Sequence, residues 1–276
     1  MLALMRGSRG FTLIETLMVV GLIGILATLS LVPIGDSLDQ AKYDRTLAQM
    51  MTIRGALLGE KLSSSTKVSF GYLGDLGSIP TTAHGLSALW QQPNDLNAWK
   101  ITPEFRMGTG WNGPYLFDQG AGGVDYSKDA WGNSYVYDPD SDPATLTSYG
   151  ADQAAGGFGL NSDITLTIPL LRQKYNLHGL ILDQGNPWSG SLEVELNLPD
   201  PATGDVGTKS YTIESSDAGA FLFEKVPPGI RSVTLFLPTK TAASVTYGPY
   251  LVTVDQPHTL LLLGTAAHPL DLSAAP

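Results

Sequence analysis

The sequence predicts an α+β protein in which a long N-terminal helix leads into a small mixed α+β head and then into an all-β domain. Three observations carry this prediction. Residues 11–34 are apolar almost throughout, and residues 36–63 carry apolar side chains near helical spacing. After residue 175, short alternating runs are separated by Gly, Pro, Asn and Asp, which is typical of an all-β domain.

The apolar run at residues 11–34 is the first element, and it follows a polar leader at residues 1–10. As a helix it is about 36 Å long, enough to cross a bilayer core of about 30 Å. The leader carries two arginines and no acid, so we expect it to stay in the cytoplasm and the rest to face outward. A cleavable signal peptide has a shorter apolar run, of about 7–15 residues.

Glu15 is the only ionisable residue of this run. A charge at the centre of a membrane helix costs about 2.5–3.5 kcal/mol, so a role as a simple membrane anchor does not explain Glu15. Glu15 is therefore a candidate functional residue that needs a partner.

The sequence G-F-T-L-I-E at residues 10–15, followed by the apolar run, resembles the leader junction of type IV pilins and type II secretion pseudopilins. The resemblance implies cleavage between Gly10 and Phe11 by a prepilin peptidase and N-methylation of Phe11. It also implies that Glu15 pairs with the α-amino group of Phe11 in a neighbouring subunit during filament assembly. Such a pair neutralises two charges, neither of which is stable alone in lipid.

We expect the same helix to continue to residue 62 and to lay an apolar stripe against the head. Pro33 predicts a kink or local unwinding, because proline removes one hydrogen bond and crowds the preceding turn. Gly59 and the serines at residues 63–65 are expected to end the helix.

Residues 63–165 form the predicted head, with a short helix at 85–91 and a hairpin strand around Tyr135 and Tyr137. Four blocks follow one another along it: P-T-T…G-L, G-W-N-G-P-Y, D-A-W-G-N-S-Y-V-Y and G-A-D…G-G-F-G…D-I. Their order is similar to the major pseudopilin of type II secretion systems, and the resemblance covers residues 11–164. It implies a pilin-type head. The family pattern has proline where this chain has Ser134.

The resemblance also implies a structural Ca²⁺ in the glycine-rich loop at residues 149–163. Asp152, Asn161 and Asp163 are the side chains that match. Carboxylates and main-chain carbonyls on a flexible backbone suit a hard cation such as calcium. The alternative is that Asp152 and Asp163 cap turns.

Residues 166–176 are interpreted as a connector and residues 177–264 as a β-sandwich. Within the sandwich, Gly219 permits a tight turn and Phe221 and Phe223 point into the core. The stretch from Asp217 to Leu237 resembles the carboxypeptidase-regulatory, transthyretin-like domain, whose members are structural or adhesive modules. Residues 265–276 are expected to form a loose tail.

Composition and motif content argue against two classes of function, nucleic-acid binding and catalysis. The net charge of −10 argues against nucleic acid as a partner, because phosphate binding needs a basic face. The chain has no cysteine, its four histidines are scattered, and it has no G-x-S-x-G motif, so we predict no enzyme.

These observations predict a structural subunit of a type II secretion-like pseudopilus, held in the bacterial inner membrane by residues 11–34 with the C-terminal part in the periplasm. Its expected partners are other copies of itself, other pseudopilins, the inner-membrane assembly platform and prepilin peptidase. Two alternatives stay open: a subunit of an extracellular type IV pilus with an adhesive domain, and a monomeric membrane-tethered binding module.

Overall fold

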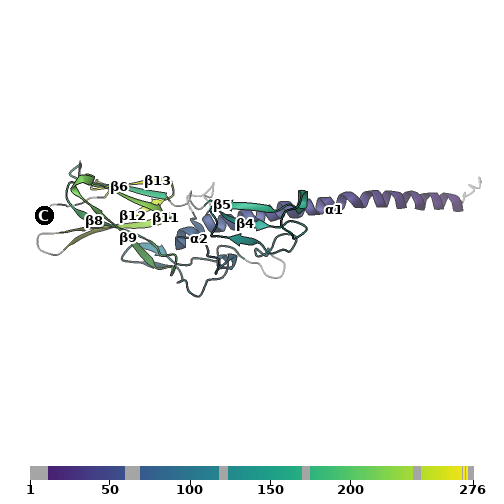
Figure 1. The fold of residues 1–276 in the computed structure, drawn as a ribbon, viewed down its shortest axis with the longest axis horizontal. Helices are drawn as coiled ribbons and strands as arrows, with labels where there is room; N and C mark the ends of the chain where they lie inside the picture. The colour runs from purple at the N-terminus through teal and green to yellow at the C-terminus, as the bar shows by residue number, and fades with distance from the viewer. Residues whose placement is uncertain are drawn as a thin grey trace, which may run out of the picture.

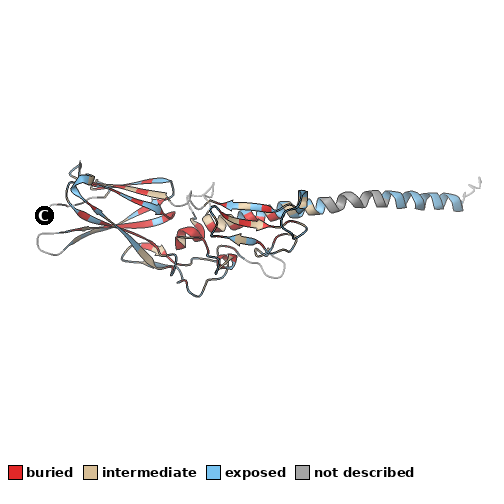
Figure 2. Ribbon diagram, viewed as in Figure 1, coloured by how far each residue is buried: buried red, intermediate tan, exposed pale blue. Residues whose placement is uncertain are grey.

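The computed structural model describes residues 12–59, 69–117, 124–169, 175–238, 244–268, 270 and 272, with only the backbone of residues 27–36. The described molecule is elongated. The helix α1 (Leu13–Leu58) projects from one end, the head follows, and a two-sheet part lies at the other end (Figure 1). Buried residues gather in one core in the head and one in the two-sheet part, whereas the projecting start of α1 is exposed (Figure 2).

The long helix has a polar cap at its start and a glycine at its end. The Thr12 side chain accepts a hydrogen bond from the backbone N–H of Glu15 at 3.4 Å. At the other end Gly59 has φ +79°, which glycine adopts without strain. The helix continues through Pro33 without local unwinding, which leaves a kink as the remaining form of the effect predicted there.

The described part of the chain contains no helix that is long and apolar enough to cross a membrane. The predicted span at residues 11–34 includes Phe11 and the side chains of residues 27–34, which lie outside the described residues.

The head is built on the second half of α1. Met50, Ile53 and Leu57 recur at helical spacing and are fully buried in its core, which also includes Leu73 and Leu89. Leu73 belongs to the short helix α2 (Gly71–Leu76), and Leu89 belongs to the short helix η1 (Leu86–Leu89). The other elements of the head are β1 (Lys100–Thr102), β2 (Met107–Thr109), β3 (Val136–Asp138), β4 (Ala144–Ser148), η2 (Gly159–Asn161) and β5 (Ile164–Ile168).

Two antiparallel sheets cover the head. β1 pairs with β2, and β3, β4 and β5 pair in that order. In the second sheet Tyr137 lies opposite Leu146, and Leu146 lies opposite Leu166. The predicted hairpin strand at Tyr137 is therefore present as β3.

The two-sheet part contains β6 (Tyr175–Asp183), β7 (Asn186–Pro187), β8 (Leu192–Pro199), β9 (Val206–Ile213), η4 (Ser215–Asp217), β10 (Ala220–Val226), β11 (Gly229–Leu237), β12 (Val245–Val254) and β13 (His258–Leu263). One sheet has the order β10-β6-β13, with β7 paired to β6, and the other has the order β12-β11-β8-β9. The pairing of β13 with β6 is parallel. Side chains of both sheets form one core, and Phe221 and Phe223 lie in it as predicted.

The two-sheet part packs directly on the head. Asp205 binds the Nζ atom of Lys100 at 2.7 Å and accepts a hydrogen bond from the side-chain amide of Asn97 at 2.8 Å. The backbone N–H of Asn97 also donates to the carbonyl oxygen of Thr203 at 2.8 Å. Beside this contact, Arg231 of β11 reaches α2. Polar contacts therefore fasten the two parts to each other.

Two predicted boundaries differ from the structure. The connector predicted at residues 166–176 overlaps β5, which runs to Ile168, and β6, which begins at Tyr175. The head therefore extends beyond residue 165, because Leu166 and Ile168 pair with β4. The tail predicted to be loose contributes Leu272, which is 3% exposed, to the core of the two-sheet part.

Candidate assembly site and calcium loop

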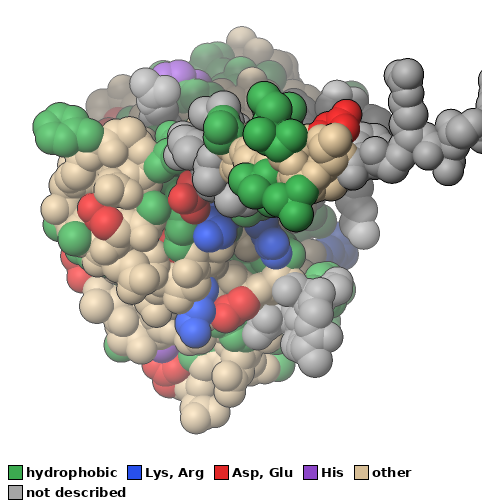
Figure 3. All heavy atoms as spheres, turned by 90° about the vertical axis from the view of Figure 1, so that its right-hand side faces the viewer, with side chains coloured by type: hydrophobic (Ala, Val, Ile, Leu, Met, Phe, Trp, Pro, Cys, Tyr) green, Lys and Arg blue, Asp and Glu red, His purple; other side chains and the backbone are tan. Residues whose placement is uncertain are grey.

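The start of α1 carries the predicted assembly residue. Glu15 lies in the first turn, where a carboxylate is favourable because the exposed N–H groups make this end of the helix positive. Around it, Leu13 is 80% exposed and Met18 is 74% exposed. Figure 3 shows these hydrophobic side chains gathered around the end of α1 that faces the viewer. Gly10 and Phe11 lie outside the described residues, so cleavage between them and the pairing of the Phe11 α-amino group with Glu15 of a neighbouring subunit remain predictions.

The D-A-W-G-N block fastens the head to α1. The indole N–H of Trp131 donates to Asp39 at 3.2 Å, and the backbone N–H of Ala130 donates to the Thr46 hydroxyl at 3.1 Å. The hydroxyl of Tyr135 donates to the Gln49 side chain at 3.2 Å. From the sequence alone this block was notable only for its resemblance to the family. The contacts show that it holds the head against α1.

Asp129 organises the same block from inside. It is 5% exposed, and its Oδ1 atom accepts hydrogen bonds from the backbone N–H groups of Trp131 and Asn133, each at 2.9 Å. Its Oδ2 atom accepts a hydrogen bond from the Ser148 hydroxyl at 2.6 Å. The carboxylate is thus satisfied by neutral donors, and it links the block to β4. Sequence reasoning missed Asp129, although an aspartate followed by W-G-N indicates a side-chain-stabilised turn.

The glycine-rich loop begins next to this cluster. The side-chain amide of Asn133 donates to the carbonyl oxygen of Gly150 at 3.0 Å, and Ala151 donates to the carbonyl oxygen of Leu160 at 3.0 Å. A Cβ atom at Gly150 would lie 2.8 Å from that Leu160 oxygen and 2.9 Å from the Ser162 oxygen. The two ends of the loop therefore lie close together, and the approach requires glycine.

Both aspartates of the predicted calcium site are exposed and stabilise turns. The Oδ1 atom of Asp152 accepts a hydrogen bond from Ala154 at 3.1 Å, and that of Asp163 accepts one from Gly156 at 3.0 Å. No three carboxylate, imidazole or thiol side chains gather as a metal-binding group in the described ranges. The possible metal ligands in this loop are carboxylate, amide and carbonyl oxygens, which are the ligand types that Ca²⁺ prefers.

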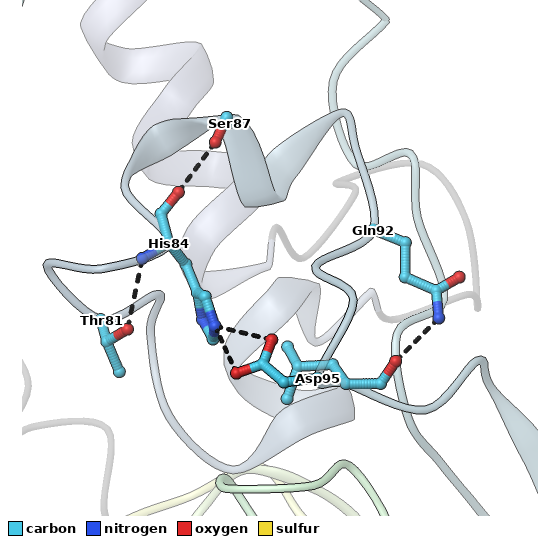
Figure 4. A network of polar contacts seen from close by, with 6 residues as sticks. Thr81, His84, Ser87, Gln92 and Asp95 are labelled. Carbon is cyan, nitrogen blue, oxygen red and sulfur yellow. Dashed lines mark hydrogen bonds and ion pairs between the residues drawn. The ribbon is translucent and has the colours of Figure 1, made fainter.

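The P-T-T…G-L block forms a separate polar network (Figure 4). The Nε2 atom of His84 lies 3.0 Å from both oxygens of Asp95, and the hydroxyl of Ser87 donates to the carbonyl oxygen of His84 at 2.8 Å. The hydrogen bond from His84 lowers the pKa of the Asp95 carboxyl below its ordinary value. These contacts hold the loop around η1 in place.

Comparison with known proteins places these features in a family. Residues 34–167 match the family described as type II secretion system (T2SS), protein G, and residues 5–31 match the prokaryotic N-terminal methylation motif. The type II secretion system core protein G of Vibrio cholerae serotype O1 is 30% identical over 162 residues, which are 58% of this chain and 92% of that relative. The chain belongs to the type II secretion system protein G family. The core protein G of Pseudomonas aeruginosa is 32% identical over 161 residues, which are 58% of this chain and 94% of that relative.

Membership in the protein G family confirms the resemblance to type II secretion pseudopilins. The family match ends at residue 167, so the two-sheet part lies outside it, and its resemblance to the carboxypeptidase-regulatory domain stays a prediction. Among solved structures, BcpA*, the major pilin subunit of Bacillus cereus, is 12% identical with a TM-score of 0.25, covering 44% of this chain and 36% of that chain. That score is too low to support an argument.

Proposed function

We propose that this protein is a structural subunit of a type II secretion pseudopilus, assembled through α1 with other copies and other pseudopilins. One observation carries the proposal: the methylation motif and the protein G match follow each other along the chain, and α1 runs unbroken through the join. Large apolar side chains at the start of α1 are exposed, and exposed apolar surface of this kind needs lipid or neighbouring helices. The proposed role is structural and includes no catalysis.

The proposed pathway begins in the inner membrane. Residues 11–34 anchor the chain, and a prepilin peptidase cleaves between Gly10 and Phe11. The α-amino group of Phe11 then pairs with Glu15 of a neighbouring copy as the helices pack side by side. This pairing supports assembly in one register, because each charge is stable in lipid only next to the other.

The mass of the mature N-terminus tests this proposal. We expect chains from membrane and sheared-filament fractions to begin at N-methylated Phe11. Chains that retain Met1, or that are cleaved beyond Thr28, would overturn the assembly pathway and would leave a tethered or secreted protein.

A surface pilus is the second candidate, and the two-sheet part favours it. This part adds residues 175–263 beyond the family match, on the end of the molecule away from the start of α1 (Figure 1). An adhesive or substrate-contacting module needs such a position. Recovery of the chain in long fibres sheared from the cell surface would support the pilus, whereas recovery only in the envelope fraction would support the pseudopilus.

We also propose that the loop at residues 149–163 binds calcium through Asp152, Asn161 and Asp163. The oxygen-only donor set and the close approach of the carbonyl oxygens of Leu160 and Ser162 to Gly150 support this proposal. We expect Ca²⁺ to raise the melting temperature of the detergent-solubilised protein, and Mg²⁺ to raise it less, since Mg²⁺ demands a tighter octahedral site. An Asp163→Asn variant should lose the calcium response. An equal response in that variant would contradict the site.

A further inference from the structure

The outer face of the sheet β10-β6-β13 carries several exposed leucines next to His178 and His258. Opposite residues on its three strands form two rows: Leu222, His178 and Leu260 in one, and Ala220, Leu180 and Leu262 in the other. Leu260 is 64% exposed, Leu262 is 39% exposed and Leu222 is 36% exposed. The leucine face is defined here as Leu180, Leu182, Leu222, Leu260 and Leu262.

The sequence of β13 shows that this face is unusual for a solvent-exposed sheet. A sheet with one wet face alternates apolar and polar residues, whereas strands covered on both faces read as continuous apolar runs. Leu260 to Leu263 form such a run, and β13 pairs with β6 in parallel, the arrangement typical of covered strands. Leu261 and Leu263 point into the core, and Leu260 and Leu262 face solvent. Residues 260–263 of β13 therefore have the pattern of a covered strand, although their outer side is exposed.

A second exposed apolar group lies at the other end of the head. Phe158 is 95% exposed, on the loop directly before η2, and η2 contacts α1. Gly156, Gly157 and Gly159 flank it with positive φ values, and its high exposure shows that the ring is not packed on the head. In Figure 1 the start of β5, which follows this loop, lies toward the projecting α1, and the two-sheet part lies at the opposite end.

We propose that the leucine face binds the Phe158 loop of a second copy of this chain. The contact joins different surfaces at opposite ends of the molecule, so it is heterologous, and repeated heterologous contacts build open helical filaments. It is compatible with parallel copies, as packing through α1 requires, whereas two leucine faces meeting each other would form a closed pair and no filament. In Figure 1 β6 and β13 lie at the upper side of the two-sheet part, at the end of the molecule away from the projecting part of α1. The inference rests on the proposed filament function.

Introduced cysteines test the contact directly, because the chain has none of its own. Phe158→Cys and Leu260→Cys are combined in one chain, which is assembled without wild-type chain and then oxidised. The matched control combines Phe158→Cys with Leu251→Cys, since Leu251 is 45% exposed on β12 of the other sheet. We expect a disulfide-linked ladder of dimers and larger species from the first pair and loss of that ladder in the control pair.

Each other outcome overturns a defined part of the proposal. If the Phe158→Cys, Leu260→Cys chain forms normal filaments but no cross-links, the contact is overturned and the filament function stands. Dimers from Leu260→Cys alone would show two leucine faces meeting and would overturn the head-to-tail arrangement. Cross-links to a different protein would overturn the second copy as the occupant. Failure of the wild-type chain to be processed and to assemble would overturn the proposed function itself, and the contact with it.

Discussion

The Nη2 atom of Arg231 donates a hydrogen bond of 2.9 Å to the carbonyl oxygen of Gly74 and so joins β11 to α2. The guanidinium is 1% exposed and also donates to the carbonyl oxygens of Pro227, Pro228 and Ile230. Burial lowers the pKa of Arg231 to about 9, and the nearby Asp75 carboxylate opposes the shift. The group therefore keeps its charge at neutral pH while it fastens the two-sheet part to the head.

Replacing Arg231 is expected to loosen this junction. Arg231→Met retains much of the side-chain volume but leaves buried carbonyl oxygens without a hydrogen-bond donor. We expect this loss to lower the free energy of unfolding by about 2–4 kcal/mol. Urea unfolding of the detergent-solubilised protein measures the loss. Arg106→Met is the matched control, since Arg106 is exposed. Equal stability of the two variants would show that the Arg231 contacts carry little of the junction.

Asp75 predicts a pH dependence of stability. Burial raises the pKa of its carboxyl from 3.8 to about 6, and hydrogen bonds from Tyr115 and Asn112 and the charge of Arg231 oppose the shift in part. Because the folded-state pKa lies above the unfolded value, the folded state binds the proton more tightly. Stability from this group is full below about pH 4 and is lost as the pH rises through 6.

The wild-type protein is therefore expected to gain about 1 kcal/mol from Asp75 between pH 7 and pH 5. Asp75→Asn should remove that gain and keep the hydrogen bond from the Tyr115 hydroxyl, which is 3.1 Å long in the wild type. Unfolding at both pH values measures the difference between the two proteins. The same pH dependence in the variant would assign the effect to another group.

Asp129 is expected to be required for a stable head. Asp129→Asn places an amide N–H₂ group against donors, namely the backbone N–H groups or the Ser148 hydroxyl, and leaves at least one without an acceptor. The expected cost is about 1–3 kcal/mol of unfolding free energy. Asp142→Asn, at an exposed position nearby in the sequence, should change stability little. Similar losses in both variants would contradict the role of Asp129.

Glu15 is expected to control assembly and not folding. Glu15→Gln keeps the shape of the side chain but cannot neutralise an ammonium group, whose unpaired burial costs about 2.5–3.5 kcal/mol, or roughly a hundredfold in filament yield. Yield is measured in the sheared fraction against Thr16→Val, a neighbouring exposed position. Normal filament yield from Glu15→Gln would remove the pairing from the mechanism.

The sequence predicted the helices and strands of this protein better than the tertiary contacts between them. The alternation at Tyr137 and the apolar spacing of Met50, Ile53 and Leu57 are local signals, and the structure contains β3 and the buried face of α1 that they predict. The connector predicted from residue 166 cuts into β5, although I-T-L-T-I at residues 164–168 alternates apolar and polar residues; the run is short, and its pairing with β4 is set by the fold.

The roles of Asp129 and Arg231 depend on partners that lie far apart along the chain. Asp129 meets Ser148 of β4, and Arg231 meets Gly74, 157 positions away. No local pattern marks such pairs, because a lone aspartate or arginine in a turn-rich segment is ordinarily solvated. The contact of Asp129 with Ser148 follows only from the packing within the head, and that of Arg231 with Gly74 only from the packing of the head against the two-sheet part.

The parallel pairing of β13 with β6 has a consequence for how this protein is made. β6 is the first strand of the two-sheet part, yet it lies between β10 and β13, the last strand. In the membrane-anchored pathway proposed above, this sheet cannot close until residues 258–263 have crossed the membrane, and contacts so distant in sequence form slowly. The pairing of β6 with β13 would then be among the last contacts to form, after the proposed anchor is in place.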